Sequence, residues 1–341
     1  MMKLHSDNHT IIIAEAGVNH NGSLERARRM IAAAREAGAD YVKFQAVGQV
    51  ENLISVTAPM ANYQKVNTGR STSQLNMVRR LMLPLEQYAL LSDWCREEGI
   101  GFSATPFDIP SISYLAELGV DFMKVPSGEI TDLPYLRAIA AAGKPVIMST
   151  GMATMEEVAA AVKVLTDGGL NSEDITLLHC TTEYPTPYAD VNLRAMLTMK
   201  QEFSTAVGYS DHTRGIEVPI AAAALGATVI EKHFTLSRSL PGPDHKASLT
   251  PAELKAMVSS VRHISQALGD GIKRVTPSER PNIAVARRSI VAARPISEGQ
   301  IITEADIAAK RPAGGLSPME WDKVVGSRAT RSYLPDEQIE L

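Results

Sequence analysis

The chain has 341 residues, of which 45% are hydrophobic and 21% charged, a composition that excludes a disordered or fibrous protein. Its 34 Lys and Arg residues against 38 Asp and Glu give a net charge of −4, which disfavours nucleic-acid binding, and two cysteines cannot form a disulfide framework. The polar start resembles no secretory signal, and no apolar stretch reaches the roughly 18–20 residues of a membrane helix. We therefore expect a soluble, cytoplasmic protein.

Short β-branched runs alternate with helical patterns from about residue 10 to residue 268. The expected strands are residues 10–14, 40–44, 101–104, 121–125, 145–148, 175–179, 205–208 and 228–231. This alternation predicts parallel strands joined by crossover helices. Eight such units favour a closed (β/α)8 TIM barrel, because an open doubly wound sheet commonly has five or six strands.

The helix ends carry chemical signals. Thr154 and Thr250 each begin a capping-box pattern. Gly38, Gly99 and Gly119 each follow an expected helix, at the position where a left-handed closing residue is typical. These signals support the boundaries of the strand–helix units.

Three segments depart from the regular pattern. Residues 45–83 are too long for a plain connection, which suggests an active-site excursion or lid. We expect the barrel to span residues 1–269, a linker residues 270–284, and a small β-rich domain residues 285–341. A unit of that size has a small core, so we expect it to need a partner surface.

Polar residues follow most of the expected strands. The carboxyl ends of barrel strands converge on one face, so residues distant in sequence meet there. The residues at or just after strand ends are Glu15, Asn19, His20, Lys43, Gln45, Thr105, Lys124, Ser127, Glu129, Ser149, Thr150, His179, Thr182, Tyr184, Ser210, Asp211, His212, Glu231, Lys232 and His233. Residues of these types are typical of an active site at the open, carboxyl end of a barrel, which we call the mouth.

Some of these residues suggest specific ligands. A single histidine at a strand end is more often a core residue, but His212 and His233 follow successive strands and could share one divalent ion with open positions for water and substrate. Lys43 and Lys124 suit an anion. Together they suggest a substrate with phosphate and carboxylate, bound against an acceptor polarised by a metal.

Several ordered motifs closely resemble the bacterial sialic acid synthase family, which includes N-acetylneuraminate and N,N'-diacetyllegionaminate synthases. They are residues 15–22, 42–45, 103–107, 124–129, 149–152, 179–185, 208–212, 231–234 and 241–245. Near the C-terminus, Lys310-Arg311-Pro312 and residues 317–321 look like the family's antifreeze-like (SAF) domain. The resemblance spans nearly the whole chain.

The resemblance implies that phosphoenolpyruvate condenses with the open-chain aldehyde of N-acetylmannosamine or a close analogue, giving a nine-carbon 2-keto acid and phosphate. It implies that His212 and His233 bind Mn²⁺, with Mg²⁺ and Co²⁺ as alternatives. By the same analogy the phosphate contacts are Lys124, Ser127, Ser149 and Ser210, the carboxylate contacts Lys43 and Thr105, and the sugar contacts Glu15, Gln45, Thr182, Tyr184 and Asp244. Glu129 is the residue we expect to handle a proton.

The family also implies a homodimer in which the SAF domain covers the partner's barrel mouth and Arg311 contacts the sugar's N-acyl group. The acceptor stays open. N-acetylmannosamine would define an N-acetylneuraminate synthase, whereas 2,4-diacetamido-2,4,6-trideoxymannose would define a legionaminate synthase. Residues 181–184 and 244–248 are slightly more typical of the second, and some neuraminate synthases carry asparagine in the first stretch.

Two other classes remain open. A Schiff-base aldolase on the same barrel would use Lys43 or Lys124 as nucleophile without a metal. A non-catalytic carbohydrate-binding role for the C-terminal unit would leave the polar mouth of the barrel unexplained.

Overall fold

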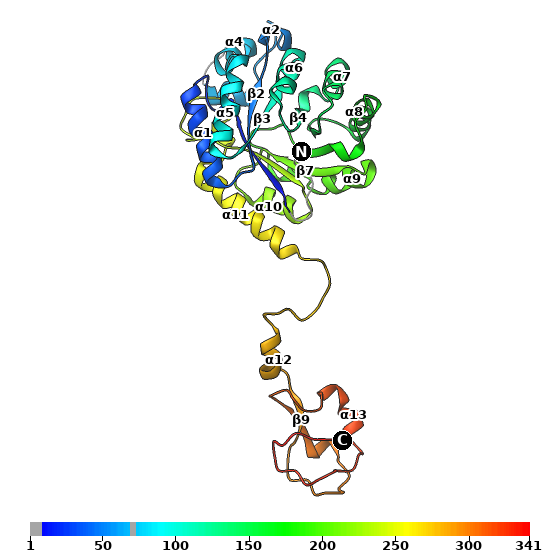
Figure 1. Ribbon diagram of the computed structural model, residues 1–341. Coiled ribbons are helices and arrows are strands. Elements are labelled where there is room, and N and C mark those ends of the chain that lie inside the picture. Colours follow the sequence, from blue (N-terminus) through cyan, green and yellow to red (C-terminus); the bar gives the residue numbers. More distant parts are fainter. Residues whose placement is uncertain (1–8, 69–72) are drawn as a thin grey trace. The chain divides into compact units, whose positions relative to one another are not determined.

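The computed structural model describes residues 9–68 and 73–341, so the polar start that argues against a secretory signal lies outside it. Within the described residues eight parallel strands form one sheet, in the order β3-β2-β1-β8-β7-β6-β5-β4. The two ends of this order, β3 and β4, lie against each other and close the barrel (Figure 1). The strands are β1 Ile11–Gly17, β2 Tyr41–Ala46, β3 Gly101–Pro106, β4 Met123–Val125, β5 Val146–Ser149, β6 Ile175–Cys180, β7 Ala206–Asp211 and β8 Val229–His233.

One long helix follows each strand and packs on the outside of the barrel (Figure 1). These helices are α1 Leu24–Ala37, α5 Tyr88–Glu98, α6 Ile109–Leu118, α7 Leu133–Ala141, α8 Met155–Asp167, α9 Arg194–Phe203, α10 Glu217–Ala224 and α11 Pro251–Leu268. The predicted TIM barrel is confirmed.

Several strands continue past their predicted carboxyl ends. β1 extends from the expected Ala14 to Gly17, and β8 extends from Glu231 to His233. Parallel pairing uses backbone groups alone, so the ladder continues through polar side chains that end the apolar run in the sequence. The polar residues of the mouth therefore stand on rigid strand ends.

Side chains alternate between the two faces of each strand, as the pleat requires. Outward residues such as Ile12 and Val42 belong to the large core between sheet and helices. Inward residues such as Ile13, Ile147 and Val229 form a separate apolar cluster inside the barrel. Each fully buried side chain of this kind contributes roughly 1.5–3 kcal/mol. This inner layer fills the barrel below the carboxyl ends of the strands, and we call it the inner floor. The polar mouth lies directly above it.

The predicted helix signals are confirmed. Thr154 and Thr250 cap α8 and α11 with complete capping boxes. Gly38, Gly99 and Gly119 close α1, α5 and α6 with φ of 85°, 72° and 86°, a left-handed conformation that glycine adopts without steric cost.

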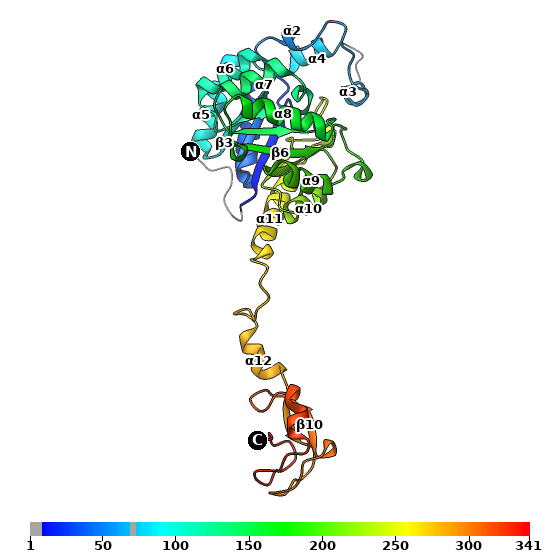
Figure 2. The same cartoon turned by 90° about the vertical axis from the view of Figure 1, so that its right-hand side faces the viewer.

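The described residues of the long segment between β2 and α5 include three short α-helices at one end of the barrel (Figure 2). They are α2 Val50–Leu53, α3 Asn62–Thr68 and α4 Gln74–Leu81. Val47, Val50, Ile54 and Leu75 form a small apolar cluster that joins α2 to α4. We call residues 49–68 and 73–82 the excursion.

A second compact unit runs from Asp270 to Leu341. It contains α12 Arg280–Ala286, the antiparallel strands β9 Ser289–Ala292 and β10 Ile307–Lys310, and α13 Trp321–Val324. Its own core includes Ile290, Ile307, Val324, Tyr333 and Ile339. This second unit thus has a hydrophobic core of its own.

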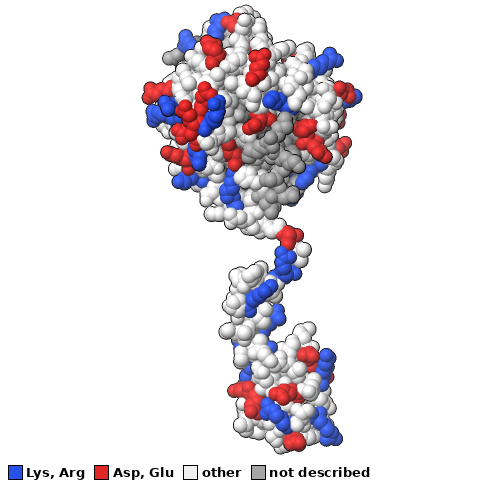
Figure 3. All heavy atoms as spheres, in the orientation of Figure 1, with Lys and Arg blue, Asp and Glu red and all other residues white. Residues whose placement is uncertain are grey.

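Acidic and basic side chains are interspersed over the face of the barrel shown in Figure 3. Over residues 9–68 and 73–341, no helix is long and apolar enough to cross a membrane.

Candidate active site

A cavity of about 240 Å³ opens at the carboxyl ends of the strands. Thirteen of the predicted site residues line it: Glu15, Lys43, Gln45, Thr105, Lys124, Ser127, Glu129, Ser149, Thr182, Tyr184, Ser210, His212 and His233. Asp244 lines an adjoining cavity that shares Gln45, Tyr184 and His233 with the first. Arg311 is exposed in the second unit, directly after β10.

Strand alternation explains which residues face the cavity. In β8, Val229 lies in the inner floor, and Glu231 and His233 follow at intervals of two and line the cavity above it. The expectation that every polar residue at or after a strand end faces the mouth is wrong for six residues. Thr150, His179, Asp211 and Lys232 have the opposite phase, whereas Asn19 and His20 lie in the turn after β1, and none of the six lines the cavity.

Two of these form a buried ion pair outside the cavity. Lys232 donates to Asp211 and to the carbonyl of Thr213, and both charged side chains are 0% exposed. Asp211 also accepts from the Thr213 backbone N–H at 2.9 Å. The pair fixes the backbone immediately before His212.

One half of the cavity is built around Lys43 on β2. Its Nζ donates to Thr105 Oγ1 at 2.6 Å and lies 2.9 Å from Glu15 Oε2 and 3.5 Å from Glu231 Oε2. Glu231 in turn accepts from Ser210 Oγ at 3.1 Å. The ammonium group is therefore held in place by partners from three neighbouring strands.

Lys124 on β4 anchors the other half. Its Nζ donates to Ser149 Oγ at 2.6 Å and to the Val125 carbonyl at 3.0 Å. Nearby, Ser127 Oγ accepts from the Gly151 N–H at 3.0 Å. Two ammonium groups and several hydroxyls thus converge on one small space, the donor set that suits phosphate and carboxylate.

The two carboxylates beside these lysines titrate in opposite directions. Burial raises the pKa of Glu15 to about 7, and the negative charge of Glu231 adds to the rise. Burial alone would also raise the pKa of Glu231, but Lys124 and Lys43 outweigh it and lower that pKa to about 2. Glu231 thus carries the charge that balances the lysines, while Glu15 can exchange a proton near neutral pH.

Glu129 lies at the wall of the same cavity. Burial, followed by the nearby Asp132 charge, raises its pKa to about 7. Its Oε2 is buried and has no hydrogen-bond partner among the described residues. A carboxyl group in this environment is suited to giving or taking a proton near pH 7.

His212 and His233 stand close together at the ends of β7 and β8, with ring centroids 5.5 Å apart. His212 Nδ1 bonds the Thr181 carbonyl at 2.6 Å, which fixes the proton on Nδ1 and leaves Nε2 with a lone pair. Burial lowers the pKa of both imidazoles, so both are neutral, the form that binds metal. The buried Nδ1 of His233 has no partner among the described residues.

These features fit a divalent cation held by two imidazoles. In the described part of the chain, no group of three or more His, Cys, Asp or Glu side chains is arranged to hold a metal. A cation at the histidine pair would therefore take its other ligands from water or substrate, which is the open coordination of a catalytic site.

Tyr184 connects the histidine pair to the excursion. Its ring centroid lies 4.1 Å from that of His212 and 5.6 Å from that of His233, which it meets edge-on. Tyr63 of α3 stacks on Tyr184 with the ring centroids 5.1 Å apart. The long segment that we expect to be an active-site excursion or lid thus contributes to the wall of the candidate site.

Sequence reasoning missed two contributors. Glu231 was placed at the mouth but given no role, although its phase between Val229 and His233 marks it as inward-facing. Tyr63 lies in a short helix whose sequence carries no signal of its contact with Tyr184.

Comparison with known proteins identifies the family of the chain. Residues 30–273 match the model of the NeuB family, and residues 287–340 match the SAF domain. N,N'-diacetyllegionaminic acid synthase of Campylobacter jejuni is 50% identical over 97% of this chain and 98% of its own. Human N-acetylneuraminate-9-phosphate synthase is 37% identical over 96% of this chain and 90% of its own.

A solved structure leads to the same assignment. The N-acetylneuraminic acid (sialic acid) synthetase of Leptospira borgpetersenii superposes with a TM-score of 0.71 at 36% identity, covering 82% of this chain and 91% of that one. The chain belongs to the NeuB family and carries a SAF domain at its C-terminal end.

Proposed function

We propose that this chain is a nonulosonic acid synthase that condenses phosphoenolpyruvate with the open-chain aldehyde of an N-acyl mannosamine-type sugar. The observation that carries the proposal is the meeting of two buried lysines and a pair of neutral imidazoles in one cavity. The names of the relatives, synthases of legionaminic, pseudaminic and neuraminic acids, support it. Carbon 3 of phosphoenolpyruvate bonds to the aldehyde carbon, water adds at carbon 2, and phosphate leaves.

The lysines bind and orient phosphoenolpyruvate. Lys124, Ser127, Ser149 and Ser210 hold the phosphate, and Lys43 with Thr105 holds the carboxylate. Both ammonium groups are already fixed by short contacts to neighbouring strands, so little side-chain freedom is lost on binding. Fixing the donor carbon against the aldehyde supplies effective molarity worth several kcal/mol.

His212 and His233 hold the divalent cation, for which we propose Mn²⁺. When bound, that ion supplies Lewis-acid polarisation of the sugar aldehyde. Tyr184, packed against both rings, keeps the imidazoles in place. Glu129 gives the proton that the new hydroxyl needs, because its raised pKa keeps it protonated up to near neutral pH.

For the acceptor we propose 2,4-diacetamido-2,4,6-trideoxymannose over N-acetylmannosamine. The relatives at 50% and 47% identity, from Campylobacter jejuni and Legionella pneumophila, both bear the name of the diacetyllegionaminic acid synthase. Glu15, Gln45, Thr182, Tyr184 and Asp244 contact or orient this sugar.

The functional assembly that we propose is a homodimer in which the SAF domain covers the partner's barrel mouth. Arg311 then contacts the sugar's N-acyl group. Arg311→Ala is expected to raise the KM for the sugar far more than the KM for phosphoenolpyruvate. Unchanged kinetics for the sugar would remove Arg311 from the site.

Phosphate release from phosphoenolpyruvate, measured with Mn²⁺ and each candidate sugar in parallel, tests the function. Release that requires the sugar and stops with EDTA supports the synthase. Turnover that survives EDTA, together with borohydride trapping of pyruvate on a lysine, would instead establish a Schiff-base aldolase.

A further inference from the structure

A second cavity of about 120 Å³ adjoins the barrel cavity beside the histidine pair and shares Gln45, Tyr184 and His233 with it. Its lining is divided by chemistry. One side is polar, with Gln45, Gln64 and Asp244. The other side is apolar and comes mainly from the excursion, with Met77, Val78, Leu81 and Met82 beside Val18 and Pro243.

The polar side presents a buried carboxyl group. Asp244 is 7% exposed, and burial raises the pKa of its carboxyl to about 6. No described residue donates a hydrogen bond to this carboxyl. Because buried polar groups are normally hydrogen-bonded, this carboxyl group is suited to accept a hydrogen bond from a hydroxyl or amide N–H of a ligand.

The apolar side is held in place by packing. Val78 and Met82 pack on the cluster of Val50, Ile54 and Leu75 that joins α2 to α4. The excursion is also tied to the barrel, because Asn67 Nδ2 donates to the Pro243 carbonyl at 2.6 Å and Tyr63 stacks on Tyr184. We call Met77, Val78, Leu81 and Met82 the α4 wall, although Met82 is the residue that follows the helix.

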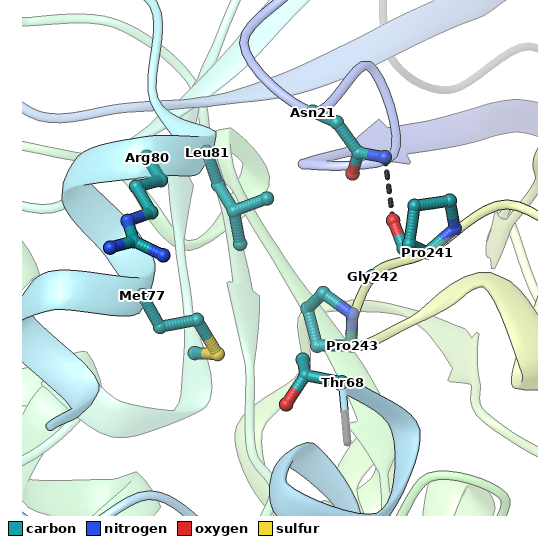
Figure 4. Close-up of a pocket in the computed structure, with 8 residues that line it drawn as sticks. All are labelled: Asn21, Thr68, Met77, Arg80, Leu81, Pro241, Gly242 and Pro243. Atoms are coloured by element: carbon teal, nitrogen blue, oxygen red, sulfur yellow. Dashed lines mark hydrogen bonds between the residues drawn. The ribbon is translucent and has the colours of Figure 1, made fainter. Parts of the chain in front are cut away.

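Beyond this wall lies a third, outer cavity of about 280 Å³, which shares Met77, Leu81 and Pro243 with the second (Figure 4). Figure 4 shows Met77 and Leu81 of α4 across this cavity from Pro241 and Pro243, with Asn21 donating to the Pro241 carbonyl at 2.6 Å. The three cavities thus adjoin in series. The second cavity is the one that joins the two features, because His233 and the α4 wall both line it.

We propose that the α4 wall determines acceptor specificity by selecting a sugar whose terminal carbon is a methyl group. The inference rests on the proposed function and names the substrate class of that site. A methyl group against this wall buries apolar surface, whereas the hydroxyl of a hydroxymethyl group there loses its water without gaining a partner. Asp244, on the opposite side, accepts from a hydroxyl or amide N–H of the same acceptor.

The test is a matched pair of substitutions in the excursion. Val78→Thr puts a hydroxyl on the wall at nearly constant volume, and Val66→Thr makes the same change in α3, where Val66 is 72% exposed and lines none of these three cavities. The measurement is the ratio of kcat/KM for 2,4-diacetamido-2,4,6-trideoxymannose to that for its 6-hydroxy counterpart. We expect Val78→Thr to lower this ratio about fivefold or more and Val66→Thr to leave it unchanged.

A ratio within twofold of wild type in folded Val78→Thr would overturn the proposal. If that variant does not fold, Met82→Gln, at a half-buried position of the same wall, decides on the same criterion. Failure of the proposed function is distinguishable, because the wild-type enzyme would then release no phosphate with either sugar. A working enzyme with an unmoved ratio refutes the α4 wall alone.

Discussion

Replacing Asp211 by asparagine should destabilise the barrel by about 3–5 kcal/mol, since it leaves the buried ammonium of Lys232 without its counter-ion. Both side chains are 0% exposed, so water cannot replace the lost partner. Asparagine can still accept from the Thr213 N–H, and Lys232 keeps its bond to the Thr213 carbonyl at 2.6 Å. The loss is therefore mainly electrostatic, and it is a large share of the roughly 5–15 kcal/mol by which domains are stable.

Urea unfolding followed by tryptophan fluorescence measures this loss. The chain has two tryptophans, Trp94 in α5 of the barrel and Trp321 in the second unit, so a Trp321→Phe background reports on the barrel alone. The matched control is Asp167→Asn, which removes the same charge from the exposed pair Lys163–Asp167 of α8. That control should cost no more than about 1 kcal/mol.

Equal effects of the two substitutions would refute the reasoning. Equal effects would mean that burial does not determine how much the Asp211–Lys232 pair contributes to the free energy of unfolding. Because Asp211 precedes His212, we also expect Asp211→Asn to weaken metal binding in molecules that remain folded.

Three further predictions concern the reaction. Activity should fall as pH rises through about 7, because Glu129 must be protonated to act as proton donor and burial raises its pKa to about 7. Glu129→Gln should abolish this fall in the pH profile, and Glu129→Asp should keep it. A fall that is unchanged in Glu129→Gln would exclude Glu129 as the donor. Gly151→Ala should raise the KM for phosphoenolpyruvate by about tenfold or more, because a Cβ there would lie 2.7 Å from Thr182 Cγ2 and 2.8 Å from Ser127 Oγ. Gly128→Ala should change this KM little, because an added Cβ there meets no atom within 4 Å. Equal KM values for the two variants would contradict the crowding argument. EDTA should stop sugar-dependent phosphate release and added Mn²⁺ should restore it, and full activity in EDTA would rule out a metal requirement.

The fold was predictable because its signals are local. Apolar runs, capping boxes and closing glycines such as Gly38 identify each strand–helix unit. The topology then brings Lys43, Lys124 and His233 together without any contact being visible in the sequence. The carboxyl ends of the strands were harder to predict from the sequence. The hydrophobic pattern stops where the polar residues of the cavity begin, but the backbone hydrogen bonds between strands continue past that point.

The errors at the site have a common physical origin. Lys232 and Asp211 satisfy the criterion of a polar residue at a strand end, but their phase directs them outward, where they pair with each other. Counting in steps of two from the inner floor separates them from Glu231 and His233. Tyr63 and the α4 wall depend on how the excursion packs, which no periodic pattern specifies. Asp244 lies in the loop after β8 and was expected from the family resemblance alone.

The most direct measurement is equilibrium binding of Mn²⁺, followed by electron paramagnetic resonance in wild-type protein and in His233→Ala. His263→Ala, an exposed histidine on α11, serves as the matched control. We expect wild type and His263→Ala to bind one ion per chain with the same affinity, and His233→Ala to lose at least about tenfold in affinity. Wild-type affinity in His233→Ala would contradict the assignment of the histidine pair as the cation site.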